Sequence, residues 1–137
     1  MKKVLIAEDS SVIQNLAKKI LEFQNFEIHS VKNGEQVLES LEKESFDIIL
    51  LDINMPIMDG ITATKLIKDL EKDNYKIPII ALTANSIAGD EEKYLAQGMN
   101  NYLSKPINAD NLYEILLKWT KPIKKETNKF NSNFKHL

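Results

Sequence analysis

Polar residues that could share one chemical task follow several of the short apolar runs in this chain. One run, Ile48 to Leu51, leads directly into Asp52. An ionised carboxylate is costly to bury unless partners accompany it. The other runs end in an acidic pair, a hydroxyl and an amine, which are Glu8-Asp9, Thr83 and Lys105. If the fold brings these ends together, three acids, a hydroxyl and a lysine meet at one place.

Such a cluster suits a metal-assisted phosphoryl acceptor. Three neighbouring carboxylates repel one another and need a cation to stay ionised together. Carboxylate oxygens facing solvent suit Mg²⁺ with several waters retained. An ionised Asp52 can then take a phosphoryl group as an acyl phosphate. Phosphoryl transfer needs positive charge around the phosphoryl oxygens, which Mg²⁺ and Lys105 would supply, with Thr83 as a hydroxyl donor.

Alternating short apolar and longer amphipathic stretches predict the elements that position these residues. Strands are expected over residues 3–7, 27–31, 47–52, 77–83 and 101–106, and helices over 11–21, 33–44, 60–73, 90–97 and 109–119. The order predicts a doubly wound α/β fold, with a flavodoxin-like five-stranded parallel sheet (strand order 2-1-3-4-5) and helices on both faces. Ligands of such sheets bind beyond the carboxyl ends of the strands, where the polar residues stand.

Length and composition limit the class of protein. A chain of 137 residues suits one domain, and a net charge of −2 favours neither a nucleic-acid nor a membrane-surface partner. The absence of cysteine excludes disulfides and thiolate metal sites and permits a reducing cytoplasm. The first apolar run is too short for a signal peptide or a membrane span. We therefore expect a soluble, cytoplasmic and monomeric protein.

The last seventeen residues differ from the rest of the chain. Residues 121–137 hold five lysines and one glutamate and carry +4, whereas residues 1–120 carry −6. This stretch is polar and asparagine-rich and shows no sustained period. We expect a disordered basic tail after a domain over residues 1–120.

The ordered set of motifs resembles the receiver domain of bacterial response regulators, the CheY-like family. The motifs are Glu8-Asp9, Asp52 within "DINMPIMDG", Thr83 within "ALTA" and Lys105-Pro106. Each pair alone is weak evidence, but the ordered combination is specific. The resemblance covers about residues 2–120, and glutamate at position 8 is a frequent variant.

The resemblance implies a role for each matching residue. Asp52 would accept the phosphoryl group. The magnesium site would be formed by Glu8, Asp9, Asp52 and Asn54, the last through its backbone carbonyl. The phosphoryl group would be stabilised by Thr83, Ala84 and Lys105. Thr83 and Tyr102 would form the switch, and the Lys105-Pro106 bond would be cis. Gly60 would be needed for the backbone geometry of the turn that closes the site.

The implied function is a phosphorylation-controlled switch of two-component or phosphorelay signalling, rather than an enzyme. Its partners would be a histidine kinase or histidine phosphotransfer protein and a downstream target that the sequence does not identify. Ile13 and the loop around Pro106 are expected to dock the phosphodonor, although Ile13 also fits a plain core position. Met1 close to the first strand favours a free-standing regulator. The alternatives are the terminal receiver of a hybrid sensor kinase, which "ALTANS" resembles, and a pseudo-receiver that binds partners without phosphorylation.

Rival functions disagree with particular residues. A flavodoxin-like FMN carrier would need a phosphate-binding loop where Glu8-Asp9 would repel phosphate. An aspartate-nucleophile phosphatase would need a general acid two residues after Asp52, where Asn54 stands. His29 and His136 have no ligand-spaced partner, so no metal site is expected at either histidine.

Overall fold

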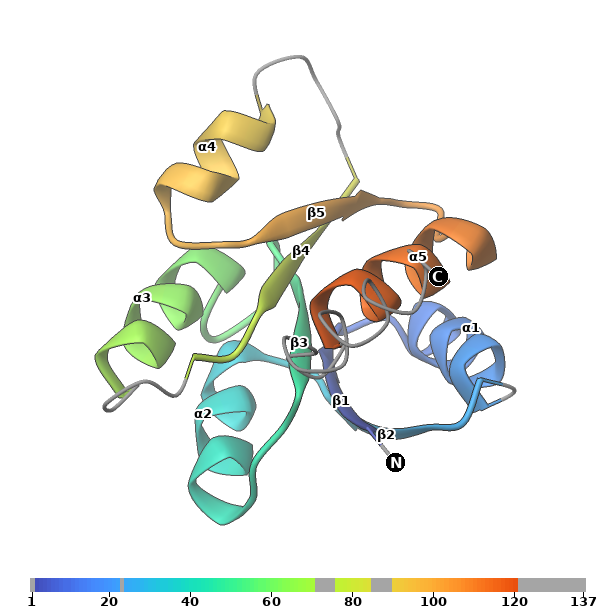
Figure 1. Cartoon of the computed structure of the whole chain (residues 1–137). Coiled ribbons are helices and arrows are strands. Elements are labelled where there is room, and N and C mark those ends of the chain that lie inside the picture. The colour runs from blue at the N-terminus through green and yellow to red at the C-terminus, as the bar shows by residue number, and fades with distance from the viewer. Residues whose placement is uncertain (1, 23, 71–75, 85–89, 121–137) are drawn as a thin grey trace, which may run out of the picture.

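The computed structural model describes residues 2–22, 24–70, 76–84 and 90–120 (Figure 1). Strands and helices alternate along the described chain in the order β1 (Lys2–Ala7), α1 (Ser11–Glu22), β2 (Phe26–Val31), α2 (Gly34–Lys43), β3 (Ile48–Asp52), α3 (Gly60–Leu70), β4 (Ile79–Thr83), α4 (Asp90–Ala96), β5 (Asn101–Ser104) and α5 (Ala109–Thr120). The predicted tail over residues 121–137 lies outside the described residues.

The strands form a single parallel sheet in the order β2-β1-β3-β4-β5. Helices α1 and α5 cover one face, and α2, α3 and α4 cover the other (Figure 1). The predicted fold class and strand order are therefore confirmed. The fourth strand begins at Ile79, later than predicted, because Pro78 has no N–H to donate to a neighbouring strand.

The central strand β3 is buried along its whole length. Ile48 and Leu50 pack into the core beneath α1 and α5, which we call the α1–α5 core. Ile49 and Leu51 pack on the opposite face, into the α2–α4 core. An uninterrupted apolar run is what a parallel strand covered on both faces requires. Its last residue, Asp52, therefore stands at a rigidly held point at the end of the sheet.

Several helices begin at a side-chain cap in the loop that follows a strand. A side-chain oxygen accepts the N–H of the residue three positions later over 2.7–3.3 Å at Ser10, Asn33, Asp59 and Asn108. Such caps satisfy N–H groups that the first helical turn leaves without partners. They hold the loops at the carboxyl ends of the strands. Across the described ranges, no helix is long and apolar enough to span a membrane.

Candidate functional site

The predicted acidic residues meet at the carboxyl edge of the sheet. Glu8 and Asp9 follow β1, and one carboxylate oxygen from each lies within 4.8 Å of an oxygen of Asp52. Glu8 and Asp52 are only 1% and 3% exposed, whereas Asp9 is exposed. The cluster thus has a buried floor and one side open to solvent.

Lys105 is the cation of this site. Its Nζ lies 2.8 Å from Oε1 of Glu8 and 3.1 Å from Oδ2 of Asp52. Burial disfavours the charge on Lys105, but hydrogen bonds to Glu8 and Asp52 outweigh it and raise the lysine pKa. The other oxygen of Asp52, Oδ1, accepts the N–H of Asn54 over 3.1 Å. Both oxygens of Asp52 are therefore oriented.

Glu8 is a member of the cluster whose negative charge is not fully compensated. Burial raises the pKa of Glu8, the charge of Asp52 adds to this, and the hydrogen bonds from Lys105 and from the N–H of Ser10 oppose it. One lysine thus does not fully compensate the buried carboxylates. A second, hard cation on the solvent side would do so, and the oxygen donor set of Glu8, Asp9 and Asp52 fits Mg²⁺.

Gln14 holds the loop that carries the two acids, and sequence reasoning missed it. Its side chain is 8% exposed, and Nε2 donates to the carbonyl oxygens of Glu8 (2.6 Å) and Val31 (2.8 Å). The N–H of Glu8 donates to the same Val31 carbonyl over 3.0 Å. The available signal was an amide side chain among the apolar positions of α1.

The turn between β3 and α3 passes very close to Asp52. A Cβ atom on Gly60 would lie 2.3 Å from the carbonyl oxygen of Asp52, and the N–H of Gly60 donates to Ile53 over 2.9 Å. Glycine is therefore needed here for this close approach. The left-handed conformation in this turn belongs instead to Ile57, with φ of 68° and a side chain that is 77% exposed.

The predicted switch residues surround the same edge. Thr83 ends β4 and is buried, Ala84 is exposed beside it, and Tyr102 is half-buried against the α2–α4 core. The Lys105-Pro106 bond is cis, as predicted. A residue that the sequence interpretation overlooked also reaches this group: the hydroxyl of Tyr94 donates to Oγ1 of Thr83 over 3.0 Å. The predicted roles in phosphoryl binding and switching stay predictions.

The predicted docking residue Ile13 is half-buried and packs against the α1–α5 core. Its neighbours on α1, Val12 and Leu16, are 77% and 40% exposed, and Pro106 is exposed as well. The apolar surface of α1 is therefore carried mainly by Val12 and Leu16. A docking role for Ile13 stays a prediction.

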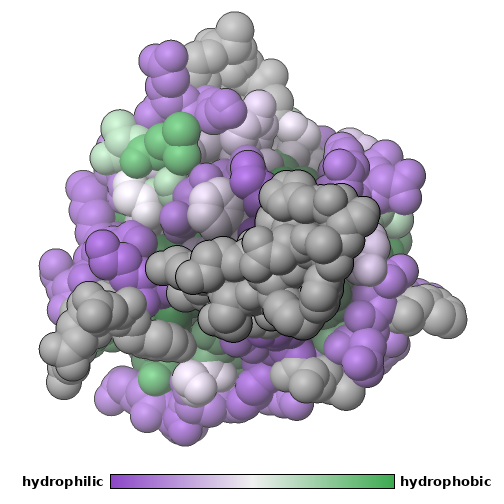
Figure 2. All heavy atoms as spheres, in the orientation of Figure 1, coloured by the Kyte–Doolittle hydropathy of each residue, from purple (hydrophilic) through white to green (hydrophobic). Residues whose placement is uncertain are grey.

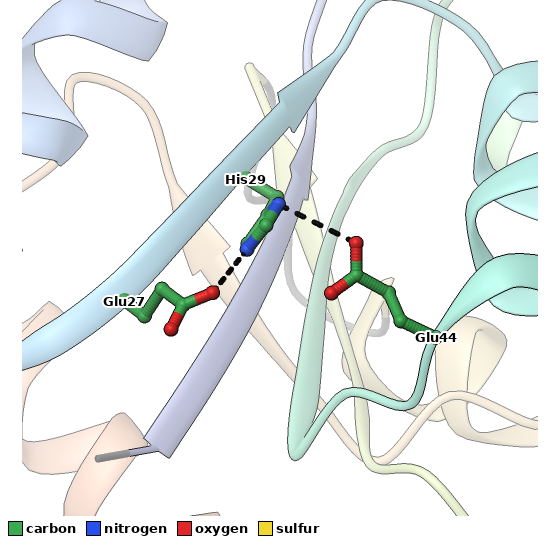
Figure 3. Close-up of side chains that lie close together, drawn as sticks. All are labelled: Glu27, His29 and Glu44. Atoms are coloured by element: carbon green, nitrogen blue, oxygen red, sulfur yellow. Dashed lines mark hydrogen bonds and ion pairs between the residues drawn. The ribbon is translucent and has the colours of Figure 1, made fainter.

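A second group of titratable side chains is formed by Glu27 and His29 on the outer strand β2 and by Glu44 at the end of α2 (Figure 3). Nε2 of His29 lies 2.5 Å from Oε2 of Glu27, and Nδ1 lies 3.7 Å from Oε2 of Glu44. The expectation that His29 has no ligand-spaced partner was wrong, because alternate residues of a strand share a face. The two carboxylates approach opposite nitrogens of the ring, and Glu44 also pairs with Lys3, so this arrangement indicates an ion-pair cluster.

Comparisons with known proteins agree with this geometry. Residues 4–117 match the family described as the response regulator receiver domain. The chain is 42% identical over 120 residues to hybrid signal transduction histidine kinase I of Dictyostelium discoideum, covering 83% of this chain and 7% of that protein. It spans less than a fifth of the length of the curated relatives it matches.

Solved structures give the same result. The receiver domain of sensor histidine kinase PA1611 from Pseudomonas aeruginosa PAO1, with magnesium in its active site cleft, is 36% identical with a TM-score of 0.79, over 88% of this chain and 98% of that one. The Saccharomyces cerevisiae receiver domain of Ssk1, crystallised with the phosphotransfer protein Ypd1, is 28% identical with a TM-score of 0.80, over 87% of this chain and 88% of that one. The acid cluster, its lysine and these matches together show that the chain belongs to the response regulator receiver domain family of two-component and phosphorelay signalling.

Proposed function

We propose that Asp52 is the phosphoacceptor of this receiver domain, supplied by a phosphohistidine of a histidine kinase or a histidine phosphotransfer protein. The observation that carries this proposal is a buried carboxylate with both oxygens oriented, by Lys105 on one side and the N–H of Asn54 on the other. A positive charge and an N–H donor are thus already positioned beside the carboxylate oxygens that would meet the phosphoryl group.

The transfer breaks the nitrogen–phosphorus bond of the donor imidazole and forms a bond between a carboxylate oxygen of Asp52 and phosphorus. The imidazole leaves as a neutral base because its other ring nitrogen carries a proton before the nitrogen–phosphorus bond breaks. Lys105 then lies within reach of the phosphoryl oxygens and takes part of their charge. Because the protein undergoes a single covalent change and returns to its start on hydrolysis, we propose a switch rather than an enzyme that turns over a substrate.

Glu8, Asp9 and Asp52, with the carbonyl of Asn54, would hold Mg²⁺ in this chain. A bound ion would supply positive charge to these carboxylates in addition to that of Lys105. The raised pKa of Glu8 supports this assignment, because it indicates that the buried acids lack enough positive charge.

Phosphorylation by a small donor tests the proposal directly. Acetyl phosphate with Mg²⁺ should add one acid-stable, base-labile phosphoryl group to the protein, as measured by intact mass. Asp52→Asn should abolish the gain in mass, and EDTA should suppress it. Asp59→Asn is a matched control, because Asp59 caps α3 and lies outside the acid cluster. Wild-type labelling of Asp52→Asn would contradict the assignment.

The physiological context is also a proposal. The relatives named hybrid histidine kinases support the terminal receiver of a hybrid kinase or phosphorelay, operating in the cytoplasm, and a free-standing regulator is consistent with the same matches. For docking, the test compares Ile13→Ser with Val12→Ser. If Ile13 docks, Ile13→Ser slows transfer from a phosphotransfer protein and spares acetyl phosphate labelling. If Ile13→Ser lowers the rates of both reactions, Ile13 stabilises the core and does not act in docking.

A further inference from the structure

Helix α4 carries a buried tyrosine that the predicted roles do not use. Tyr94 is 6% exposed, although its neighbour Leu95 is 47% exposed and hydrophobic surface lies over α4 (Figure 2). The phenol of Tyr94 donates to Oγ1 of Thr83 over 3.0 Å. A buried tyrosine hydroxyl needs such a partner, and here the partner is the proposed switch hydroxyl.

The alternation of β4 explains why Thr83 meets α4. Leu82 packs into the α1–α5 core, whereas Ala81 packs into the α2–α4 core. Thr83 lies two residues after Ala81, so its side chain continues on the α4 side of the sheet. A hydroxyl that donates to a phosphoryl group on Asp52 must bring its oxygen within about 3 Å of the phosphoryl oxygens. In the observed position the Thr83 hydroxyl instead accepts from Tyr94 on the α4 side of the sheet.

Tyr94 also borders the second switch residue. The ring centroids of Tyr94 and Tyr102 lie 6.3 Å apart with a tilt of 50° between the planes, and both side chains pack in the α2–α4 core. Because the core is closely packed, a shift of one ring should displace the other. Tyr94 thus borders both groups whose positions the proposed switch would change.

We propose that Tyr94 is a latch of the switch: its hydroxyl holds Thr83 on the α4 side in the unphosphorylated protein, and this hydrogen bond breaks when Thr83 moves toward a phosphoryl group. This inference rests on the proposed function of Asp52. Tyr94 is a positioning residue, because it acts through Thr83 and does not touch the reacting atoms. The latch stabilises only the resting state, so it lowers the population of the active state.

If Tyr94 is a latch, removal of its hydroxyl should increase the affinity for a phosphoryl mimic. Tyr94→Phe deletes one oxygen and keeps the ring in the core. The net contribution of a neutral hydrogen bond corresponds to a change of about twofold to tenfold in a two-state equilibrium. Tyr94→Phe should therefore raise the apparent affinity for a phosphoryl mimic by about that factor.

The experiment titrates the full chain with beryllium trifluoride at saturating Mg²⁺, with all four tyrosines replaced by 3-fluorotyrosine. Fluorine NMR then reports the Tyr102 and Tyr94 signals, assigned by single Tyr→Phe variants. In the wild-type protein both signals should shift on saturation. Tyr94→Phe should reach half-saturation at a lower concentration of mimic. Tyr113→Phe is the matched control, because Tyr113 packs against the α1–α5 core on the other face of the sheet.

The outcomes separate the latch from the proposed function. In a Thr83→Ala background, mimic affinity is read from the amide NMR signals of the loop that carries Glu8 and Asp9. Tyr94→Phe should have no effect on it there, because no hydroxyl is left to hold. Equal or weaker binding by Tyr94→Phe relative to Tyr113→Phe would overturn the latch. So would a Tyr94 signal in the wild-type protein that stays unchanged at saturation, a measurement that does not depend on the variant folding. A wild-type protein that never binds the mimic would overturn the proposed function itself.

Discussion

The main-chain N–H of Lys105 donates to the carbonyl oxygen of Thr83 over 2.8 Å. This bond joins the end of β5 to the end of β4 through backbone atoms alone. The two side chains have different tasks, since Lys105 pairs with Asp52 and the Thr83 hydroxyl accepts from Tyr94. The position of Lys105 therefore does not depend on which side chain stands at position 83.

Thr83→Ala should consequently separate phosphorylation from its structural effect. Labelling of Asp52 by acetyl phosphate should stay within about threefold of the wild-type rate, because Lys105 keeps its place and only one hydrogen-bond donor is lost. The shift of the Tyr102 signal on saturation with beryllium trifluoride should disappear. Thr83→Ser, which keeps the hydroxyl, should retain the shift. If Thr83→Ala shifted the Tyr102 signal as fully as wild type, the coupling would have to run through other residues.

Gln14→Leu should weaken the magnesium site without replacing any of its proposed ligands. The substitution removes the donor from the Glu8 carbonyl and leaves a buried acceptor without that bond, which costs about 1–3 kcal/mol of unfolding free energy. The loop that carries Glu8 and Asp9 then has fewer ties to α1, so Mg²⁺ affinity should fall severalfold. Magnesium titrations followed by amide NMR of this loop, with urea unfolding alongside, measure both effects.

Gln36→Leu is the control for that comparison. Its side-chain oxygen accepts the N–H of Lys32 at the exposed surface, over 2.7 Å. The substitution changes amide to alkyl in the same way but leaves the Glu8 carbonyl bonded. Equal losses of Mg²⁺ affinity in Gln14→Leu and Gln36→Leu would rule out a special role for Gln14.

Magnesium binding should weaken on acidification. Burial raises the pKa of Glu8 above its ordinary 4.5, so Glu8 takes up a proton at a higher pH than an exposed glutamate. Mg²⁺ binds the ionised form, and protons compete with it. Affinity should therefore fall as the pH drops through the raised pKa of Glu8. Glu8→Gln should bind more weakly at neutral pH and lose the pH dependence that Glu8 causes above 4.5.

The same pKa shift has the opposite effect on the stability of the metal-free protein, which acidification should increase. The folded form holds this proton more tightly than the unfolded chain does. The stability contribution is thus present below pH 4.5 and is lost as the pH rises through the folded-state pKa. Urea unfolding in EDTA should show this loss, and Glu8→Gln should reduce it. The comparison is the change in unfolding free energy between pH 4.5 and the folded-state pKa of Glu8. If this free energy rose in the wild-type protein by as much as in Glu8→Gln, the assignment would be wrong.

Ile57→Asn should stabilise the fold. A β-branched residue at φ of 68° is strained, and the conformation costs about 1–2 kcal/mol for most side chains, whereas asparagine tolerates it. Because Ile57 is 77% exposed, little packing is lost. The unfolding free energy should rise by about 1 kcal/mol. Val12→Asn, at an equally exposed apolar position outside the left-handed region, should bring no such gain.

The sequence alone could predict much of this architecture, because its signals are local. The apolar run before Asp52 indicated a strand covered on both faces, and β3 is buried throughout. The convergence of Glu8, Asp9, Asp52 and Lys105 followed from parallel strands ending at one edge. The cis bond before Pro106 followed from the family resemblance and is present.

The parts that could not be predicted depend on contacts between distant segments. Gln14 bridges the carbonyl of Glu8 in a loop and that of Val31 at the end of β2, and Tyr94 reaches Thr83 from another element. Sequence spacing therefore indicates neither role. The need for glycine at position 60 arises from a carbonyl eight residues earlier, which only the folded turn brings near. Of the two partners of His29, Glu27 is local and could have been predicted from strand alternation, whereas Glu44 comes from another segment.

The place of β3 in the sheet gives the protein a direction of response. The β3 strand has a hydrogen-bonded neighbour on each side and a core on each face, whereas β5 pairs with β4 alone. A phosphoryl group on Asp52 would therefore add charge at the end of a strand whose displacement would break two ladders. At the other edge of the sheet, the Gln14 side chain joins the end of β2 to the loop that carries Glu8. It does so by donating to the carbonyls of Val31 and Glu8. We therefore expect a perturbation at Asp52 to be passed on toward α4 and β5, because β5 is held in the sheet by its pairing with β4 alone.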